Sequence, residues 1–224
     1  MFKALLLAAL TGIASPAMAQ SVWSVEGVAG VVSDYRYRGY SLSDQQPAIQ
    51  AGATLSHQSG LYGDVYLSTI DEYGVDAEGH GAQVELTASF GWSGAVGGLD
   101  VDAAISRYVY PEGEDVDYFE APLQVGQTLG DLTWTLGLAY APTQTALGDD
   151  DNRYGWAGLT LAPAQWPVSL STRLGYERGA FAPDGKTDWS VGLGRTFGSA
   201  TLDLTWADSD AEAGALVASV FFAF

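Results

Sequence analysis

The sequence predicts an all-β fold, a transmembrane antiparallel up-and-down β-barrel of about twelve strands. Three observations predict it. The chain ends in a strand with an apolar side chain at every second position, its connections alternate between short and long, and its strand carboxylates oppose apolar stripes. A barrel in lipid needs this arrangement, because its outer surface contacts hydrocarbon while its inner surface is polar.

The N-terminus reads as a secretory signal peptide covering residues 1–19. Lys3 supplies a positive charge, residues 4–14 form an apolar run, and Ala17-Met18-Ala19 gives a small-x-small cleavage pattern. The run is too short to cross a bilayer as a helix, and no other segment reaches about 18 apolar residues. We therefore expect residues 20–224 to form a single β-barrel domain.

The composition excludes several kinds of partner. The chain carries 27 acidic and 9 basic residues, a formal net charge of −18, so nucleic acid is not expected to bind. Cysteine is absent, which removes disulfides and thiolate metal sites. The abundance of glycine (28), tyrosine (12) and tryptophan (7) is typical of exported barrels, although secreted β-sandwiches share it.

Twelve strands are expected between clusters of Gly, Pro, Asn and Asp. Every second connection is a tight turn, such as Gly130-Asp131 or Gly198-Ser199, and the others are expected to be longer loops. We expect the short turns and both termini to lie in the periplasm. Pro122 cannot donate a ladder hydrogen bond, so a bulge is expected there. In chain order, the predicted strands cover residues 23–37, 47–57, 61–70, 82–93, 99–110, 118–129, 132–142, 153–162, 168–177, 188–197, 200–207 and 215–224.

The two faces of these strands differ in polarity. In strand 82–93, Val84, Leu86 and Phe90 share one face, whereas Glu85 and Ser89 share the other. We interpret the polar face as the interior of the barrel. A soluble β-sandwich would alternate in the same way with its faces exchanged, so the prediction also depends on the signal peptide, the loop pattern and the terminal phenylalanine.

Charged residues in the inward phase are the candidates for lining a pore. Most of them are acidic, so an open lumen would prefer cations. Arg36 and Arg38 could form half of a charge-sorting constriction, or a structural ion-pair ladder that fixes the first hairpin to the wall. The candidates are Glu26, Asp34, Arg36, Arg38, Asp64, Glu85, Asp102, Glu120, Arg173 and Asp203.

No catalytic site, metal site or cofactor is expected. The two histidines, His57 and His80, are predicted on opposite rims, and neither has a serine and an acid placed beside it for a catalytic triad. Residues 149–152 could gather a divalent cation, but they lack the framework of an EF-hand and are better explained as a solvated acidic loop.

The C-terminal strand carries the signal expected for membrane insertion. Leu216, Val220, Phe222 and Phe224 fall on one face, and Phe224 is the last residue. This pattern resembles the terminal strand of Gram-negative outer-membrane proteins. The resemblance implies that the barrel-assembly machinery recognises this strand.

A longer resemblance lies near the N-terminus, within the stretch from Ser33 to Asp44 and the Pro47-Ala48-Ile49-Gln50 that follows it. The stretch resembles the hallmark of the TorF-like porin family, and the chain departs from it at Val65-Tyr66, where a Trp is expected. The resemblance implies an outer-membrane barrel. The matching residues are Ser33, Tyr35, Arg38, Gly39, Ser41, Ser43, Pro47 and Gln50.

Two functions and their partners follow as expectations. The first is passive diffusion of small hydrophilic solutes through an outer-membrane channel, with a possible cation preference. The alternative is a closed structural or surface-interaction barrel whose acidic loops contact lipopolysaccharide, divalent cations or a partner. A secreted soluble β-sandwich is a third interpretation.

Overall fold

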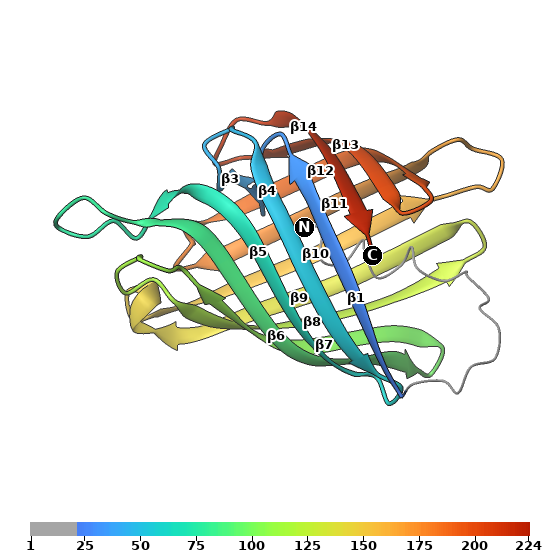
Figure 1. The fold of residues 1–224 in the computed structure, drawn as a ribbon, viewed down its shortest axis with the longest axis horizontal. Helices are drawn as coiled ribbons and strands as arrows, with labels where there is room; N and C mark the ends of the chain where they lie inside the picture. Colours follow the sequence, from blue (N-terminus) through green and yellow to red (C-terminus); the bar gives the residue numbers. More distant parts are fainter. Residues whose placement is uncertain (1–21) are drawn as a thin grey trace.

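The computed structural model describes residues 22–224, and the predicted signal peptide, residues 1–19, lies outside this part. Twelve strands of the described part form one closed antiparallel barrel (Figure 1), which confirms the predicted fold. They are β1 (Trp23–Val32), β4 (Ala48–His57), β5 (Leu61–Tyr73), β6 (Ala82–Val96), β7 (Leu99–Val109), β8 (Tyr118–Leu129), β9 (Leu132–Gln144), β10 (Asp150–Leu161), β11 (Ser169–Gly179), β12 (Ala182–Phe197), β13 (Ala200–Ser209) and β14 (Ala215–Ala223).

The remaining elements are short. The strands β2 (Arg36–Tyr37) and β3 (Tyr40–Ser41) pair only with each other, and η1 (Thr145–Leu147) is a 3-10 turn. Among residues 22–224, no helix has the length and apolar character required to cross a membrane.

The barrel closes where its first and last strands meet. β1 pairs with β14 from Val28↔Ala223 to Val32↔Ser219. Beyond this ladder, Gly27 N–H donates to the Phe224 carbonyl at 2.9 Å, and Phe224 N–H donates to the Gly27 carbonyl at 3.0 Å. The Phe224 ring lies where a side chain at Gly27 would be, so the glycine permits this close approach.

Polarity is inverted relative to a soluble protein. The outer face exposes large apolar side chains, such as Phe90 (66 %) and Leu138 (63 %). The interior buries ionisable groups, including Glu120, Glu177 and Lys186 at 1–2 % exposure. Charged residues are rarely buried in soluble domains unless they are paired, so a soluble sandwich does not explain this distribution.

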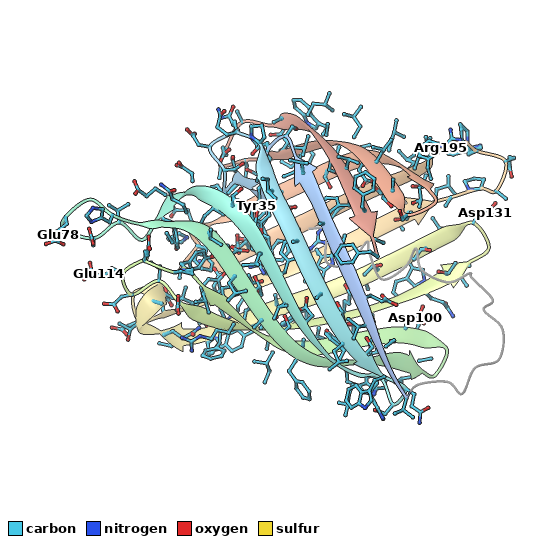
Figure 2. All side chains as sticks on the ribbon, in the orientation of Figure 1. Tyr35, Glu78, Asp100, Glu114, Asp131 and Arg195 are labelled. Carbon is cyan, nitrogen blue, oxygen red and sulfur yellow. The ribbon has the colours of Figure 1, made fainter. Side chains whose placement is uncertain are left out.

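The two ends of the barrel differ in their connections (Figure 2). One end, termed the long-loop rim, carries Glu78 and Glu114. The opposite end, termed the short-turn rim, carries Asp100, Asp131 and Arg195. The expected periplasmic position of the short-turn rim and the termini remains a prediction.

One expected long loop is instead part of the sheet. β12 begins at Ala182, so that only residues 180–181 connect it to β11. Its added residues continue the ladder, in which Glu177 pairs with Lys186. The two side chains form an inward ion pair of 2.7 Å, which supplies a physical reason for the extension.

The prediction of a bulge at Pro122 is wrong. The pairing of β7 with β8 keeps one register on both sides, from Ala103↔Leu123 to Ser106↔Glu120. The missing N–H of proline interrupts the ladder locally, but no extra residue enters the strand, so the register does not shift.

The first strand also differs from its predicted bounds of 23–37. It ends at Val32, and residues 33–46, termed the luminal hairpin, leave the wall. Three of their charged side chains are buried, with Asp34 at 4 %, Arg36 at 5 % and Arg38 at 6 % exposure, whereas Asp44 is exposed. Arg36 and Tyr37 pair with Ser41 and Tyr40 in the small β2–β3 ladder rather than with the barrel wall.

Candidate functional site

The lumen has a filled half and an open half. The luminal hairpin fills the half toward the long-loop rim, where Tyr35 is buried. The other half is a cavity of about 890 Å³, termed the vestibule, which extends to His57, Gly198 and Phe224 at the short-turn rim. Its inner end is bounded by Tyr35, Tyr37 and Arg38. In this structure the vestibule therefore ends at the luminal hairpin.

A tight turn places Arg38 at the tip of the hairpin. Arg38 and Gly39 have φ angles of 51° and 88°, the positive values typical of a two-residue hairpin turn. A side chain at Gly39 would meet Ser209, with its Cβ 2.6 Å from the Ser209 Cβ. Glycine at this position thus allows the tip to approach the wall at β13.

Arg38 links the hairpin to two wall strands. Its Nη2 lies 2.6 Å from Glu120 Oε2 on β8, and its Nη1 lies 2.8 Å from Glu177 Oε1 on β11. Its guanidinium carbon also lies 4.4 Å from the ring centroid of Tyr154 on β10. Both carboxylates are 2 % exposed, so these ion pairs are hardly screened by water.

Arg36 is held at the base of the hairpin. Its Nε lies 2.6 Å from Asp34 Oδ2, and its Nη2 lies 3.2 Å from Glu212 Oε1 in the loop before β14. It also donates to the carbonyls of Gly39 and Ala213. Of the two interpretations offered by the sequence, these contacts favour structural pairing for Arg36.

Tyrosine hydroxyls join the hairpin to Glu85 on β6. Tyr35 donates to Glu85 Oε1 and Tyr110 to Glu85 Oε2, each at 3.0 Å. Burial, reinforced by the charge of Glu85, raises the pKa of the Tyr35 hydroxyl well above its ordinary value. Tyr35 therefore remains a protonated donor, and the Glu85 carboxylate is stabilised by hydrogen bonds rather than by a cation.

Lys186 completes the filled half, and sequence reasoning missed it. Its ammonium lies 2.7 Å from Glu177 Oε2 and 3.7 Å from the ring centroid of Tyr40. Asn152 donates to the Glu177 Oε1 at 2.9 Å. The predicted strand bounds left Lys186 in a loop. The chain has only one other lysine, Lys3, and this rarity was a signal in the sequence that could have marked Lys186 as a candidate.

The vestibule is acidic near the wall strands β1, β5 and β7. Glu26, Asp64 and Asp102 line it, and no basic side chain among residues 22–224 lies within ion-pair distance of them. Tyr62 donates to Asp102 at 3.0 Å. On the facing side, Arg173 lies over Trp156, with 4.5 Å between the guanidinium carbon and the ring centroid.

The sequence-predicted lining residues fall into three groups. Asp34 and Arg36 are buried within the luminal hairpin. Asp203 lies on the inner face of β13 beside Gly194, outside the vestibule lining. The residues that do line the vestibule are Glu26, Arg38, Asp64, Glu85, Asp102, Glu120 and Arg173.

The remaining sequence candidates lie at the end of the chain and in the acidic stretch at the start of β10. Phe222 and Phe224 are 52 % and 82 % exposed at the end of the chain. In the acidic stretch, Asp151 pairs with Arg153 at 2.6 Å. Within residues 22–224, no three His, Asp or Glu side chains gather in the way a metal ion would require.

The described barrel is similar in fold to solved outer-membrane proteins. The NanC porin shares 9 % identity with a TM-score of 0.53, covering 89 % of this chain and 98 % of that chain. An outer membrane channel from Pseudomonas putida F1 shares 14 % identity with a TM-score of 0.50, covering 92 % and 97 %. A porin refined at 1.8 Å shares 15 % identity with a TM-score of 0.43, and the chain spans 62 % of its length. At these identities the likeness concerns the fold.

Sequence comparison gives one family match. A family model described as a bacterial protein of unknown function matches residues 16–222. None of the curated proteins is significantly similar in sequence to the chain.

Proposed function

This chain belongs to the Gcw_chp family, a family of bacterial proteins of unknown function, so we propose its function from its geometry. The proposed function is that of a porin-type outer-membrane channel for passive diffusion of small hydrophilic solutes. The vestibule carries this proposal. It is a cavity of about 890 Å³ with carboxylates on its wall, enclosed by a barrel whose outer face is apolar. The resemblance to the TorF-like porin family around Arg38 and Gly39 supports the same role.

The charges of the vestibule support a preference for cations. Glu26, Asp64 and Asp102 lie on its wall without an arginine or lysine partner among the described residues, and the arginines that line the same cavity are Arg173 and Arg38. A pore lined by excess carboxylate lowers the electrostatic barrier for cations and raises it for anions. Which solute is favoured also depends on the side chains of the filled half of the lumen.

Diffusion across the whole barrel requires the luminal hairpin to move. The filled half contains ion pairs of 2.6–2.8 Å around Arg38, and its charged residues are nearly inaccessible to water. We therefore assign the structure to the closed state of the channel. The open state is one in which the hairpin leaves the lumen or shifts along it.

The filled lumen also favours the second candidate function. A barrel permanently closed by the luminal hairpin would act as a structural or surface-interaction protein. Its acidic loops, including those carrying Glu78 and Glu114, would contact lipopolysaccharide, divalent cations or a partner at the long-loop rim.

The membrane environment is part of the proposal. Outer-membrane lipid and lipopolysaccharide contact the apolar exterior, and the barrel-assembly machinery recognises the terminal strand through Phe222 and Phe224. The signal peptide is cleaved, and the termini face the periplasm. Nucleic acid, a cofactor and catalysis have no role in this function.

Planar-bilayer recording separates the two candidates. Folded protein, verified by its heat-modifiable migration in a gel, is inserted and examined over a range of applied voltages. The channel gives discrete current steps, and in a salt gradient its reversal potential has the sign expected for a cation-selective pore. Silence at every voltage from correctly folded protein would overturn the channel and favour the closed barrel.

A further inference from the structure

The compartment around the Arg38 side chain is built by wall residues. Its polar walls are Glu120 of β8 and Glu177 of β11, which bind the guanidinium at 2.6 and 2.8 Å. An aromatic wall is Tyr154 of β10, whose ring centroid lies 4.4 Å from the guanidinium carbon. These residues belong to barrel strands, so the compartment persists when the hairpin moves. We propose that it is a binding site for guanidinium-bearing organic cations, which Arg38 occupies as a tethered ligand in the closed state.

The charges of the compartment require a single cation. Glu120 and Glu177 carry two negative charges, and Lys186 offsets one of them through its 2.7 Å contact with Glu177 Oε2. Arg38 offsets the other. The buried Asp188, which accepts from the Tyr154 hydroxyl, has the charge of Arg173 near it. If Arg38 leaves, one negative charge remains at residues that are 2 % exposed, and an uncompensated buried charge is strongly unfavourable. A monovalent cation from solution restores the balance.

The shape of the compartment favours a guanidinium over an ammonium. Two carboxylates receive N–H donors from two edges of one planar group, and an aromatic ring covers its face. A guanidinium presents such a fork and is weakly hydrated, whereas an ammonium is a compact and strongly hydrated charge. Lys186 and Arg173, whose guanidinium carbon lies 5.7 Å from the Tyr154 ring centroid, disfavour a second positive charge. The site therefore suits monovalent solutes rather than polyamines.

The site is reachable from the vestibule. Arg38, Glu120 and Tyr154 all line its inner end, so a solute that enters at the short-turn rim meets them without crossing the wall. This inference deepens the proposed channel function, because it names the solute class that exchanges with Arg38.

Chemical rescue tests the site without relying on conductance. The full barrel carrying Arg38→Ala is refolded in detergent, and its thermal unfolding midpoint is measured with millimolar methylguanidinium, methylammonium or potassium chloride at equal ionic strength. Methylguanidinium is expected to raise the midpoint of Arg38→Ala in a saturable manner. Methylammonium and potassium are expected to leave that midpoint unchanged, and none of the three cations is expected to raise the midpoint of the wild type. Adding Glu120→Gln to the Arg38→Ala variant should abolish the rescue, because the carboxylate that accepts from the probe is lost.

Each outcome bears on the proposal. If Arg38→Ala folds poorly, refolding yield with each cation replaces the midpoint, and selective recovery by methylguanidinium supports the site. Equal responses to the three cations, or rescue that survives Glu120→Gln, would overturn it. If rescue is observed while the folded wild type and Arg38→Ala never conduct, the binding site stands and the channel proposal fails. If both conduct without selective rescue, the channel stands and the binding site fails.

Discussion

At the scale of single residues, Glu85 shows how a buried carboxylate can organise the lumen without a cation. It is 3 % exposed and accepts hydrogen bonds from Tyr35 and Tyr110, one on each carboxylate oxygen. Hydrogen bonds to a charged group are stronger than neutral ones, and a buried acceptor that loses its donor pays a desolvation penalty. Tyr35 thus couples the luminal hairpin to β6.

The Tyr35→Phe substitution should therefore destabilise the protein. It removes one donor to Glu85 while keeping the ring, and we expect a loss of about 1–3 kcal/mol in the free energy of unfolding. Denaturant unfolding in detergent micelles measures it. Tyr140→Phe, on the outer face, is the matched control and should change the free energy by less than about 0.5 kcal/mol. Equal effects at both positions would contradict the coupling role of Tyr35.

Asp102 is the residue at which ion preference can be tested with least disturbance of the filled half. It lines the vestibule, and its side chain accepts from Tyr62 rather than from a base. Asp102→Asn should shift the reversal potential of a conducting barrel toward zero in a salt gradient, most clearly at low ionic strength. Asp131→Asn in an exposed short turn serves as the control. An unchanged reversal potential for Asp102→Asn would reject its place on the ion path.

At the scale of elements, the luminal hairpin is separate from the barrel ladder. β2 and β3 pair only with each other, whereas β1 and β4 pair directly from Trp23↔His57 to Val32↔Ala48. The hairpin is attached by side chains and by single backbone bonds, such as Asp71 N–H to the Leu42 carbonyl at 2.7 Å. The ladder between β1 and β4 is therefore continuous without the hairpin.

Replacing residues 34–45 by a short Gly/Ser linker should therefore leave a folded barrel with a higher conductance. Glu85, Glu120 and Glu177 would become hydrated, and the lumen would be continuous from rim to rim. Single-channel recording measures the conductance, and heat-modifiable migration reports folding. Replacing residues 75–80, in the exposed loop after β5, provides a control that should leave conductance unchanged. A folded variant without increased conductance would show that the hairpin is not the barrier.

At the scale of the whole molecule, stability in lipid depends on the apolar exterior. Leu204 lies in the middle of β13 and is 44 % exposed, as expected for a side chain that contacts hydrocarbon. By contrast, Arg195 is an outward cation near the short-turn rim, where its guanidinium carbon lies 4.4 Å from the Phe197 ring centroid. An interfacial position lets such a charge remain hydrated.

A charge in the middle of the exterior should consequently be costly. Leu204→Arg is expected to reduce the free energy of folding into lipid vesicles by about 2–4 kcal/mol, because the guanidinium would lie near the bilayer centre. Phe197→Arg, at the last residue of β12, should cost only about 0–1 kcal/mol. Urea titrations of folding into vesicles measure both. Equal costs would contradict the proposed depth of Leu204 in the membrane.

Much of this architecture is encoded locally. The alternation of Val84, Leu86 and Phe90 with Glu85 and Ser89 assigns the two faces of β6, because successive side chains of a strand point in opposite directions. Turn residues then separate the strands, and their number and order follow. These features depend on neighbours in the sequence, so the chain by itself determined the strands and the two faces of each. The assignment of the polar face to the interior also needed the loop pattern, the terminal phenylalanine and the signal peptide.

The closing of the lumen was decided only by the tertiary structure. Arg38 meets Glu120 and Glu177 at sequence separations of 82 and 139 residues, and nothing local to Arg38 indicates either partner. Lys186 joined the site because β12 extended its ladder to pair with Glu177. Period 2 places a charge on the inner face, but the choice between facing water and meeting a partner depends on which segments share the lumen.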